Sequence, residues 1–273
     1  MMTKLKHLTA LPEQPESGAM PVLFLGHGSP MNAIEENNFS KGWRRMGESL
    51  PKPTAVLCIS AHWLTKGTYV TAMEQPVTIH DFGGFPKALF DMRYPAKGDP
   101  ELALAAQESA KNNSIALTHD WGLDHGAWSV LTHLYPSANV PVVQLSLDYS
   151  LDLAEHYKLA KSLASLRKKG VLIMGSGNIV HNLRMLDWHL STGFDWAIEA
   201  NEKIKSLIRN RDHAALINYQ TLGVAVKLAV PTPDHYLPLI YALALQEENE
   251  QASFFNDEAV VGSITMTSVK IDV

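Results

Sequence analysis

Short apolar runs alternate with amphipathic stretches along most of this chain. Runs such as 22–25, 55–60 and 171–174 have the length of buried β-strands, and Gly, Pro or small polar residues end them. Between such runs, apolar residues that recur every three or four positions predict helices. Strands and helices that alternate in this way favour one α/β domain with a central, largely parallel or mixed sheet flanked by helices.

The predicted elements leave only a short segment outside this domain. We expect strands over 22–25, 55–60, 69–73, 140–147 and 171–174, two closing strands within 254–271, and helices over 38–49, 99–111, 127–134, 151–169, 194–211, 213–220 and 237–247. Residues 1–20 are polar with scattered Pro and Gly, which predicts an N-terminal arm. No repeat, low-complexity run or linker divides the remainder, so we predict a single domain over 21–273.

Composition excludes several classes of protein. The chain has 273 residues and a formal net charge of −5, which disfavours a broad nucleic-acid-binding face. Its single cysteine, Cys58, lies in an apolar run and cannot form a disulfide within the chain, which fits a reducing compartment. We see no secretory signal pattern and no apolar run long enough to span a bilayer. We therefore expect a cytoplasmic protein without a membrane partner, and the sequence leaves its oligomeric state open.

The chain contains 12 histidines, and their surroundings divide them into groups. His27, His62 and His181 each follow a buried apolar run, whereas His125 and His235 lie in turns defined by Asp, Gly or Pro. Such backbone is stiff, so these five imidazoles can be held in place. We expect the remaining histidines to be solvated or hydrogen-bonded within the protein: His7, His119, His133, His156, His189 and His213. His80 lies in a glycine-rich loop that could line a pocket, and we expect it to be only a loop residue.

The three histidines that follow buried runs suggest a metal site. The carboxyl ends of parallel strands meet at one edge of a sheet, so His27, His62 and His181 can meet although they are far apart in sequence. Neutral imidazole binds zinc and non-haem iron, and three histidines with an open position are typical of a catalytic site. The alternative is that they are separate buried polar residues. The spacing alone leaves both interpretations open.

Other catalytic motifs are incomplete. The turns at 26–28 and 175–177 lack the third glycine of a dinucleotide-binding fingerprint, and the chain has no Walker-type Gly-Lys-Ser/Thr. Ser176 lacks the Gly-x-Ser-x-Gly frame of a nucleophile elbow, and there is no His-Glu-x-x-His. Cys58 is expected to be buried in a strand, where a thiol is a poor nucleophile.

Six motifs, in this order, resemble the class III (LigB-like) extradiol ring-cleavage dioxygenases, and among them the 4,5-DOPA dioxygenase-like branch. They are Gly-His-Gly-Ser-Pro (26–30), Ser-Ala-His-Trp (60–63), His-Asp-Phe-Gly-Gly-Phe-Pro (80–86), Leu-Asp-His-Gly-Ala-Trp (123–128), Gly-Ser-Gly-Asn-Ile-Val-His-Asn (175–182) and Thr-Pro-Asp-His-Tyr (232–236). The resemblance extends from about residue 21 to the C-terminus. It is specific for the family, and it does not identify one substrate.

The resemblance implies roles for individual histidines. It implies that His27, His62 and His235 bind the metal. His181 would act as acid and base on the open side of the metal or serve as a fourth ligand, and His125 would face the bound catechol. Relatives that cleave protocatechuate have a glutamate as third ligand, where this chain has His235. Three neutral ligands leave the full charge of a divalent ion in place and resemble a zinc hydrolase site more than the usual iron facial triad.

The resemblance also implies a reaction and its reactants. A catechol and O₂ would be the substrates, and oxygen would be inserted into the ring next to the diol. Electron transfer from the ring to O₂ needs a redox-active ion, and zinc has no accessible redox couple. We therefore expect Zn²⁺ as the ion found in the purified protein and Fe²⁺ as the ion needed for turnover. The alternatives are a zinc-dependent hydrolase and a non-enzymatic metal-binding protein on the same fold.

Aromatic side chains give a further indication of the substrate. Trp63 and the aromatic residues of 82–85 favour a pocket for a flat ring, although such residues can equally belong to the core.

Overall fold

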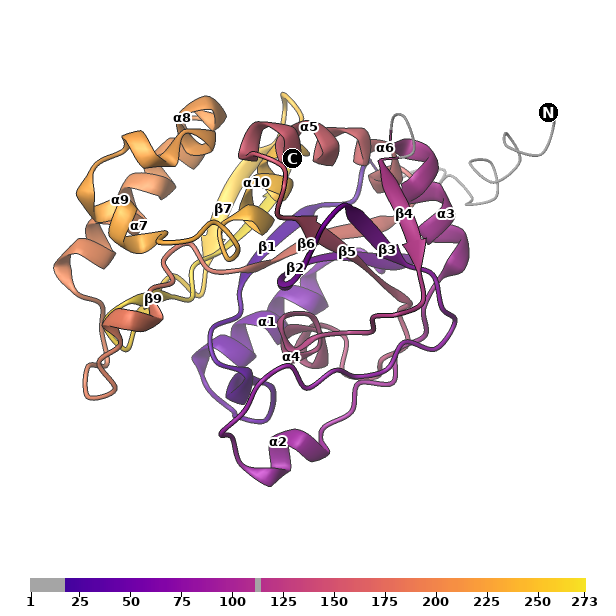
Figure 1. Ribbon diagram of the computed structural model, residues 1–273, viewed down its shortest axis with the longest axis horizontal. Coiled ribbons are helices and arrows are strands. Elements are labelled where there is room, and N and C mark those ends of the chain that lie inside the picture. The colour runs from indigo at the N-terminus through magenta and orange to yellow at the C-terminus, as the bar shows by residue number, and fades with distance from the viewer. Residues whose placement is uncertain (1–17, 111–113) are drawn as a thin grey trace.

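The computed structural model describes residues 18–110 and 114–273, which form a mixed sheet with the strand order β4-β3-β5-β2-β6-β1-β10-β7 (Figure 1). Its strands are β1 (Val22–Gly26), β2 (Ala55–Thr65), β3 (Thr68–Thr71), β4 (Ile115–Thr118), β5 (Val142–Asp148), β6 (Val171–Gly177), β7 (Gln251–Phe255) and β10 (Ser268–Asp272). The strands β8 (Ala259–Val260) and β9 (Ile264–Thr265) form a separate two-stranded ladder. The predicted α/β domain with a mixed sheet is confirmed.

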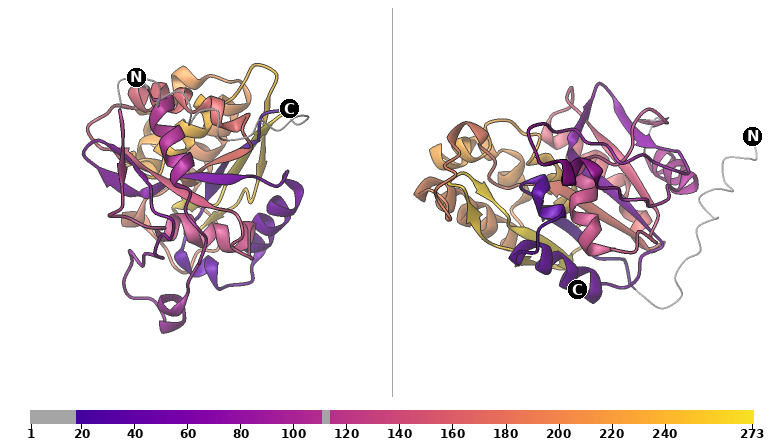
Figure 2. Two further views of the ribbon diagram at one scale, coloured as in Figure 1. Left: turned by 90° about the vertical axis from the view of Figure 1, so that its right-hand side faces the viewer. Right: turned by 90° about the horizontal axis from the view of Figure 1, so that it is seen from below.

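Helices cover both faces of this sheet (Figure 1 and Figure 2). They are α1 (Asn38–Ser49), α2 (Lys87–Asp91), α3 (Pro100–Ser109), α4 (His125–Leu134), α5 (Leu153–Ser162), α6 (Ala164–Arg167), α7 (Asp195–Arg209), α8 (His213–Ile217), α9 (Val224–Ala229) and α10 (Leu237–Ala244). In Figure 1, α1 and α4 lie on one side of the sheet and α5, α6 and α10 on the other, with α7, α8 and α9 at the end next to β7. Short 3₁₀ turns occur at Pro30–Ala33, Leu183–Met185 and Tyr219–Thr221.

Two apolar cores arise because successive residues of a strand face opposite sides of the sheet. In β1, Val22 and Phe24 belong to the core under α3, α5 and α10, whereas Leu23 and Leu25 belong to the core under α1 and α4. Strand β6 pairs in parallel with both β1 and β2. The carboxyl ends of these three strands therefore lie at one edge of the sheet, where ligands bind in open α/β sheets.

Several predicted elements differ in length from the observed ones. Strand β2 runs on to Thr65 past a register shift, so His62 lies inside the strand and not after it. Strand β6 continues through Gly177 because its last residues still pair with β1. The predicted helix over 151–169 is divided into α5 and α6 at Leu163. The predicted helix over 127–134 begins two residues earlier, because Asp124 caps it.

Other elements were not predicted. Strand β4 and the short helices α2 and α9 lie in segments without a strong periodicity. The segment 213–220 holds the short α8 and part of a 3₁₀ turn, and the closing region holds four short strands in place of two. Most of the predicted arm lies outside the described residues, as does the end of the predicted helix over 99–111. The boundary between an arm and the domain stays a prediction.

The start of the described chain is tied to the rest of the fold. Met20 is 2% exposed, and its carbonyl accepts a hydrogen bond of 2.7 Å from Nε of the buried Arg167. The same guanidinium donates to the carbonyl of Leu245 and pairs with the carboxylate of Glu250. This network joins α6, the entry to β1 and the turn after α10 at the end of the sheet opposite the histidines.

Candidate active site

Three histidines from distant parts of the sequence meet at the carboxyl edge of the sheet. Ligand atoms of His27, His62 and His235 all lie within 4.8 Å of one another. The two Nε2 atoms of His27 and His62 are 3.0 Å apart. The ring centroid of His235 lies 5.3 Å from the ring centroid of His27 and 5.0 Å from that of His62. This is the trio that the family resemblance implies. The strand ends alone suggested His181 in place of His235. His181 lies in a neighbouring group with Asp234 and His235, whose ligand atoms are also within 4.8 Å of one another, and its role as a fourth ligand stays a prediction.

The backbone places His27 at the end of β1. Its amide donates to the carbonyl of Gly177 at 3.1 Å, which continues the pairing between β1 and β6. The chain then turns through Gly28, which has a φ of +61°, and a Cβ there would lie 2.4 Å from Sδ of Met266. Glycine is therefore required for the turn that presents His27 to the pocket.

His235 reaches the same edge because β6 ends in glycine. Its carbonyl accepts a hydrogen bond of 3.0 Å from the amide of Asn178. A Cβ at Gly177 would lie only 2.1 Å from that carbonyl oxygen. The rigid turn at 232–236 can thus pack directly against the end of β6. The glycines after this strand were visible in the sequence, but their contact with a residue almost 60 positions later was not.

Hydrogen bonds on the far side of the rings fix their tautomers. The hydroxyl of Ser176 donates to the carbonyl of Gly126 at 2.5 Å, so it accepts from Nδ1–H of His27 at 3.0 Å. Asp234 accepts from Nδ1–H of His235 at 2.6 Å. Both rings therefore turn an unprotonated Nε2 toward the group. Nδ1 of His62 lies 3.6 Å from Oδ2 of Asp81, which favours the same tautomer.

This donor set fits a divalent cation. With Nδ1 protonated, His27 and His235 each have an Nε2 lone pair for a cation, and Nε2 of His62, 3.0 Å from that of His27, can supply a third when it carries no proton. Burial and the neighbouring His62 lower the pKa of His27 well below its usual value, and burial and His125 do the same for the pKa of His62. Neutral imidazoles are the form that binds zinc or iron, and carboxylate partners on the other ring nitrogen are typical of such ligands.

A fourth histidine, His125, is held by a carboxylate that our sequence analysis did not single out. Oδ1 of Asp81 accepts from the backbone amide of His125 and Oδ2 accepts from its Nδ1–H, both at 2.9 Å. Burial acts to raise the pKa of Asp81, but the hydrogen bond from His125 holds it below its usual value. The ring centroid of His125 is 3.8 Å from that of His62. The available signal for Asp81 was its place in the motif at 80–86.

The start of α4, which carries His125, rests on a second buried carboxylate. Asp124 is fully buried, accepts from the hydroxyl of Ser60 at 2.7 Å and from Nε2 of Gln144 at 2.5 Å, and caps α4. Burial and the nearby Asp81 raise the pKa of Asp124. These contacts fix α4 to β2 and β5, so the position of His125 is set by the sheet.

His181 lies beside the group and stacks on His235. Their ring centroids are 3.5 Å apart and the ring planes differ by 8°. Within the described part of the chain, neither ring nitrogen of His181 has a hydrogen-bond partner. Burial, and then His235, lower the pKa of His181 to about 3.

His80 does not line the pocket. Its Nε2 forms a hydrogen bond with the carbonyl of Met92, so His80 is a loop residue, as expected from the sequence.

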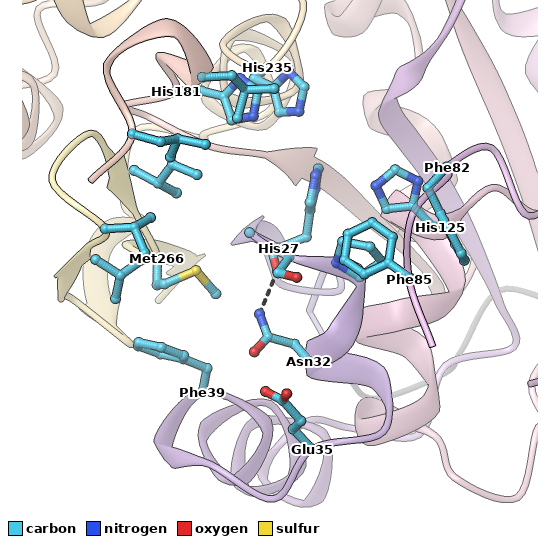
Figure 3. Close-up of a pocket in the computed structure, with 18 of the residues that line it drawn as sticks. His27, Asn32, Glu35, Phe39, Phe82, Phe85, His125, His181, His235 and Met266 are labelled. Carbon is cyan, nitrogen blue, oxygen red and sulfur yellow. Dashed lines mark hydrogen bonds between the residues drawn. The ribbon is translucent and has the colours of Figure 1, made fainter. Parts of the chain in front are cut away.

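The histidines His27, His62, His125, His181 and His235 all line a cavity of about 510 Å³. Figure 3 shows His181 and His235 at one end, with Phe82 and Phe85 along one wall. The predicted pocket for a flat ring is thus supported for the two phenylalanines. Trp63 does not line the pocket, because its ring is buried and stacks on Trp121 with the planes 2° apart.

The fold and site together define an α/β protein with a histidine-rich pocket at the carboxyl edge of its sheet. A family model described as the catalytic LigB subunit of aromatic ring-opening dioxygenase matches residues 21–269. The chain belongs to this LigB family. None of the helices in the described ranges has the length and apolar character needed to cross a bilayer.

Individual relatives agree with the family match. A protein of Escherichia coli K12 named 4,5-DOPA dioxygenase extradiol is 45% identical over 93% of this chain and 96% of its own length. A Beta vulgaris protein of the same name is 36% identical over 93% of this chain and 97% of its own length. The crystal structure of an uncharacterized protein from E. coli K12 superposes with a TM-score of 0.81 at 40% identity, covering 93% of this chain and all of that one.

Proposed function

We propose that this protein is a metal-dependent extradiol dioxygenase that uses O₂ to open the ring of a catechol with a DOPA-like side chain. The bond between one diol carbon and its unsubstituted neighbour breaks, and both oxygen atoms enter the product, a semialdehyde acid. The observation that carries the proposal is the convergence of His27, His62 and His235 beside a pocket walled by phenylalanines. Family membership and the names of the relatives support the same reaction.

We assign the metal to the three converging imidazoles, with Ser176, Asp81 and Asp234 as the groups that orient them. A redox-active ion held there would supply the electron path between an aromatic diol and O₂, which no side chain in the pocket supplies. We propose Fe²⁺ as the ion for turnover. Zn²⁺, which imidazoles bind more tightly than Fe²⁺ and which has no redox couple, would fill the same site in the purified protein.

Two further histidines would move protons. Among the described residues, neither ring nitrogen of His181 has a hydrogen-bond partner, and the ring lines the pocket beside His235, so we assign it the uptake and later return of a phenolic proton. Asp81 binds Nδ1–H of His125 and leaves Nε2 of that ring toward the pocket. His125 can therefore accept a hydrogen bond from a catechol hydroxyl, and, once protonated and paired with Asp81, it can stabilise an anionic oxygen.

The test begins with metal-free protein reconstituted anaerobically with Fe²⁺ or with Zn²⁺. After mixing with O₂ and a catechol, the iron form should consume one O₂ per catechol and yield a ring-opened aldehyde, while the zinc form should consume none. Absence of O₂ uptake by the iron form with every catechol tested would overturn the proposal. Zinc-dependent hydrolysis of esters or amides would then favour the hydrolase, and metal binding without turnover would favour the non-enzymatic alternative.

The cellular setting stays a prediction. The free, buried Cys58 supports a reducing cytoplasm. The small-molecule partners that we propose are the catechol and O₂.

A further inference from the structure

Among the described residues that line the pocket, Glu35 has the one carboxylate, and it lies at the end opposite the paired rings of His181 and His235 (Figure 3). Glu35 follows the 3₁₀ turn after β1, and its backbone amide donates to the carbonyl of Met31 at 3.1 Å. Its side chain is exposed and lines the same cavity as the histidines. A glutamate carboxylate is negatively charged at neutral pH. The far end of the pocket is therefore negative.

Within the described part of the chain, the Glu35 carboxylate has neither a hydrogen bond nor a salt bridge. Its neighbour Glu36 shows the contrast, because Oε1 of Glu36 pairs with Nη2 of Arg44 at 2.6 Å. The described residues that line the pocket include no lysine and no arginine. A cation that satisfies Glu35 would thus have to come from a molecule in the pocket.

The other polar side chains at this end already have partners in the protein. Asn32 donates to the carbonyl of His27 at 3.0 Å and accepts from Nδ2 of Asn37 at 2.8 Å. Asn37 in turn accepts from the first amides of α1. Phe39, by contrast, lines the pocket with its aromatic ring, and the face of such a ring attracts an ammonium group. The end of the pocket thus offers a carboxylate and an aromatic ring.

We infer that Glu35 is a specificity-determining residue that binds an ammonium group on the side chain of the catechol. The inference rests on the proposed function and narrows its substrate class to catechols with an alkylammonium side chain. With the diol at the histidines, the side chain would extend toward Glu35 and Phe39. A catechol whose side chain ends in a carboxylate would meet Glu35 without a cation in the pocket lining to compensate.

Three catechols with a two-carbon unit attached to the ring test this inference: dopamine, 4-ethylcatechol and 3-(3,4-dihydroxyphenyl)propionate. The unit ends in an ammonium group, in hydrogen and in a carboxylate, so the side chains are cationic, neutral and anionic. For the iron-loaded wild type, kcat/KM should fall in that order, and added NaCl should reduce the differences. A catechol amino acid carries both charges, and its kcat/KM should lie between those of the cationic and the anionic compound.

The variant Glu35→Gln should lower kcat/KM for dopamine by about five-fold, as expected for one partly exposed charge pair. It should leave the value for 4-ethylcatechol within about two-fold and raise that for the propionate. Glu35→Lys should reverse the preference between the charged compounds. The matched control is Glu36→Gln, which makes the same change in net charge outside the pocket and should leave the ratios unchanged. An equal loss with all three catechols, or an unchanged ratio in Glu35→Gln, would overturn the inference.

A binding measurement separates this inference from the proposed function. Calorimetry with the zinc-loaded protein, which should not turn over, gives the Kd of dopamine and of 4-ethylcatechol directly. A preference for dopamine that Glu35→Gln removes would support the role of Glu35 even if the iron form cleaved no catechol. If the iron form cleaves catechols but both proteins bind the two compounds equally, the inference fails and the proposed function remains.

Discussion

Buried histidines occur in two regions of this protein, and their hydrogen bonds differ. Between α5 and α10, His156 is fully buried, and both its ring nitrogens have protein partners: Nε2–H donates to the carbonyl of Asp148 at 3.1 Å, and Nδ1 accepts from the hydroxyl of Tyr241 at 3.0 Å. At the carboxyl edge, His27 and His235 are also buried. Ser176 and Asp234 hold their Nδ1 atoms, whereas the neighbour of Nε2 of His27 is another histidine nitrogen, Nε2 of His62 at 3.0 Å.

The difference shows how a structural histidine can be told from a ligand. The hydrogen bonds of His156 are complete, so the ring needs nothing from outside the protein. At the carboxyl edge, Ser176 and Asp234 hold Nδ1 of His27 and of His235, and the other nitrogen of each ring faces the neighbouring histidines. Buried polar groups are nearly always satisfied. Ring nitrogens that converge on one another, each held from behind, are therefore typical of a ligand set for a cation and not of a completed hydrogen-bond network.

The largest expected effect on ring cleavage comes from a change in the group formed by His27, His62 and His235. His62→Ala removes one of the three converging nitrogens at a position where the side chain is 20% exposed, so folding should be little affected. Ring cleavage by the iron-loaded protein should fall by at least about 10⁴-fold, as when a group essential to the chemistry is lost. Metal content per chain and O₂ uptake measure this. His80→Ala is the control, and equal activity in both variants would contradict our assignment of His62.

The second expected effect concerns the support of His125. Asp81→Asn replaces the acceptor of Nδ1–H by an amide and removes the negative charge that favours the protonated ring. We expect kcat to fall by about 100-fold, the low end of the range for general acid–base groups. Single-turnover measurements with substrate bound anaerobically separate this loss from weaker binding. A change in KM alone would indicate that Asp81 acts only on binding.

His156→Phe should change stability and not chemistry. The variant removes one of two hydrogen bonds to the Asp148 carbonyl, which Leu151 N–H still reaches, and leaves the Tyr241 hydroxyl without its histidine partner. The free energy of unfolding should therefore fall by about 1–3 kcal/mol. Urea unfolding at 25 °C measures this, and kcat should stay at the wild-type value. A lost ring-cleavage activity in the folded variant would mean that the two regions are not separate.

The loss of stability in His156→Phe should also depend on pH. Burial lowers the pKa of His156 from its usual 6.5, so the folded state favours the neutral ring. Its contribution to stability is therefore present above the unfolded-state pKa and is lost as pH falls through the folded-state value. The stability difference between wild type and His156→Phe should shrink below about pH 6.5. A difference that grows with acidity would contradict this sign.

The smallest expected effect is at Ser176, whose hydroxyl joins His27 to Gly126. Ser176→Ala should weaken metal binding by about ten-fold, as when an outer partner of a ligand histidine is removed. Competition with a chelator of known affinity measures the change. Unchanged affinity would show that packing alone fixes the His27 ring.

Much of the fold could be predicted because its signals are local. The apolar runs of β1, β2 and β6 and the cap of α3 at Asp99 are visible within a few residues. The candidate site was predicted less completely from the residues alone. Strand ends indicated His27 and His62, but His235 precedes a helix, and only the family resemblance brought it into the group. Asp81 and Asp234 were missed because their role depends on which imidazole they contact in space.

The order of these residues along the chain has a consequence for biosynthesis. Positions 27 and 62 emerge from the ribosome long before position 235 and the helix α10 behind it. A nascent chain in which position 235 has not yet emerged would hold two of the three imidazoles and bind metals only weakly. Tight loading thus has to wait for α10, and cation uptake during refolding would report the docking of that helix beside β6.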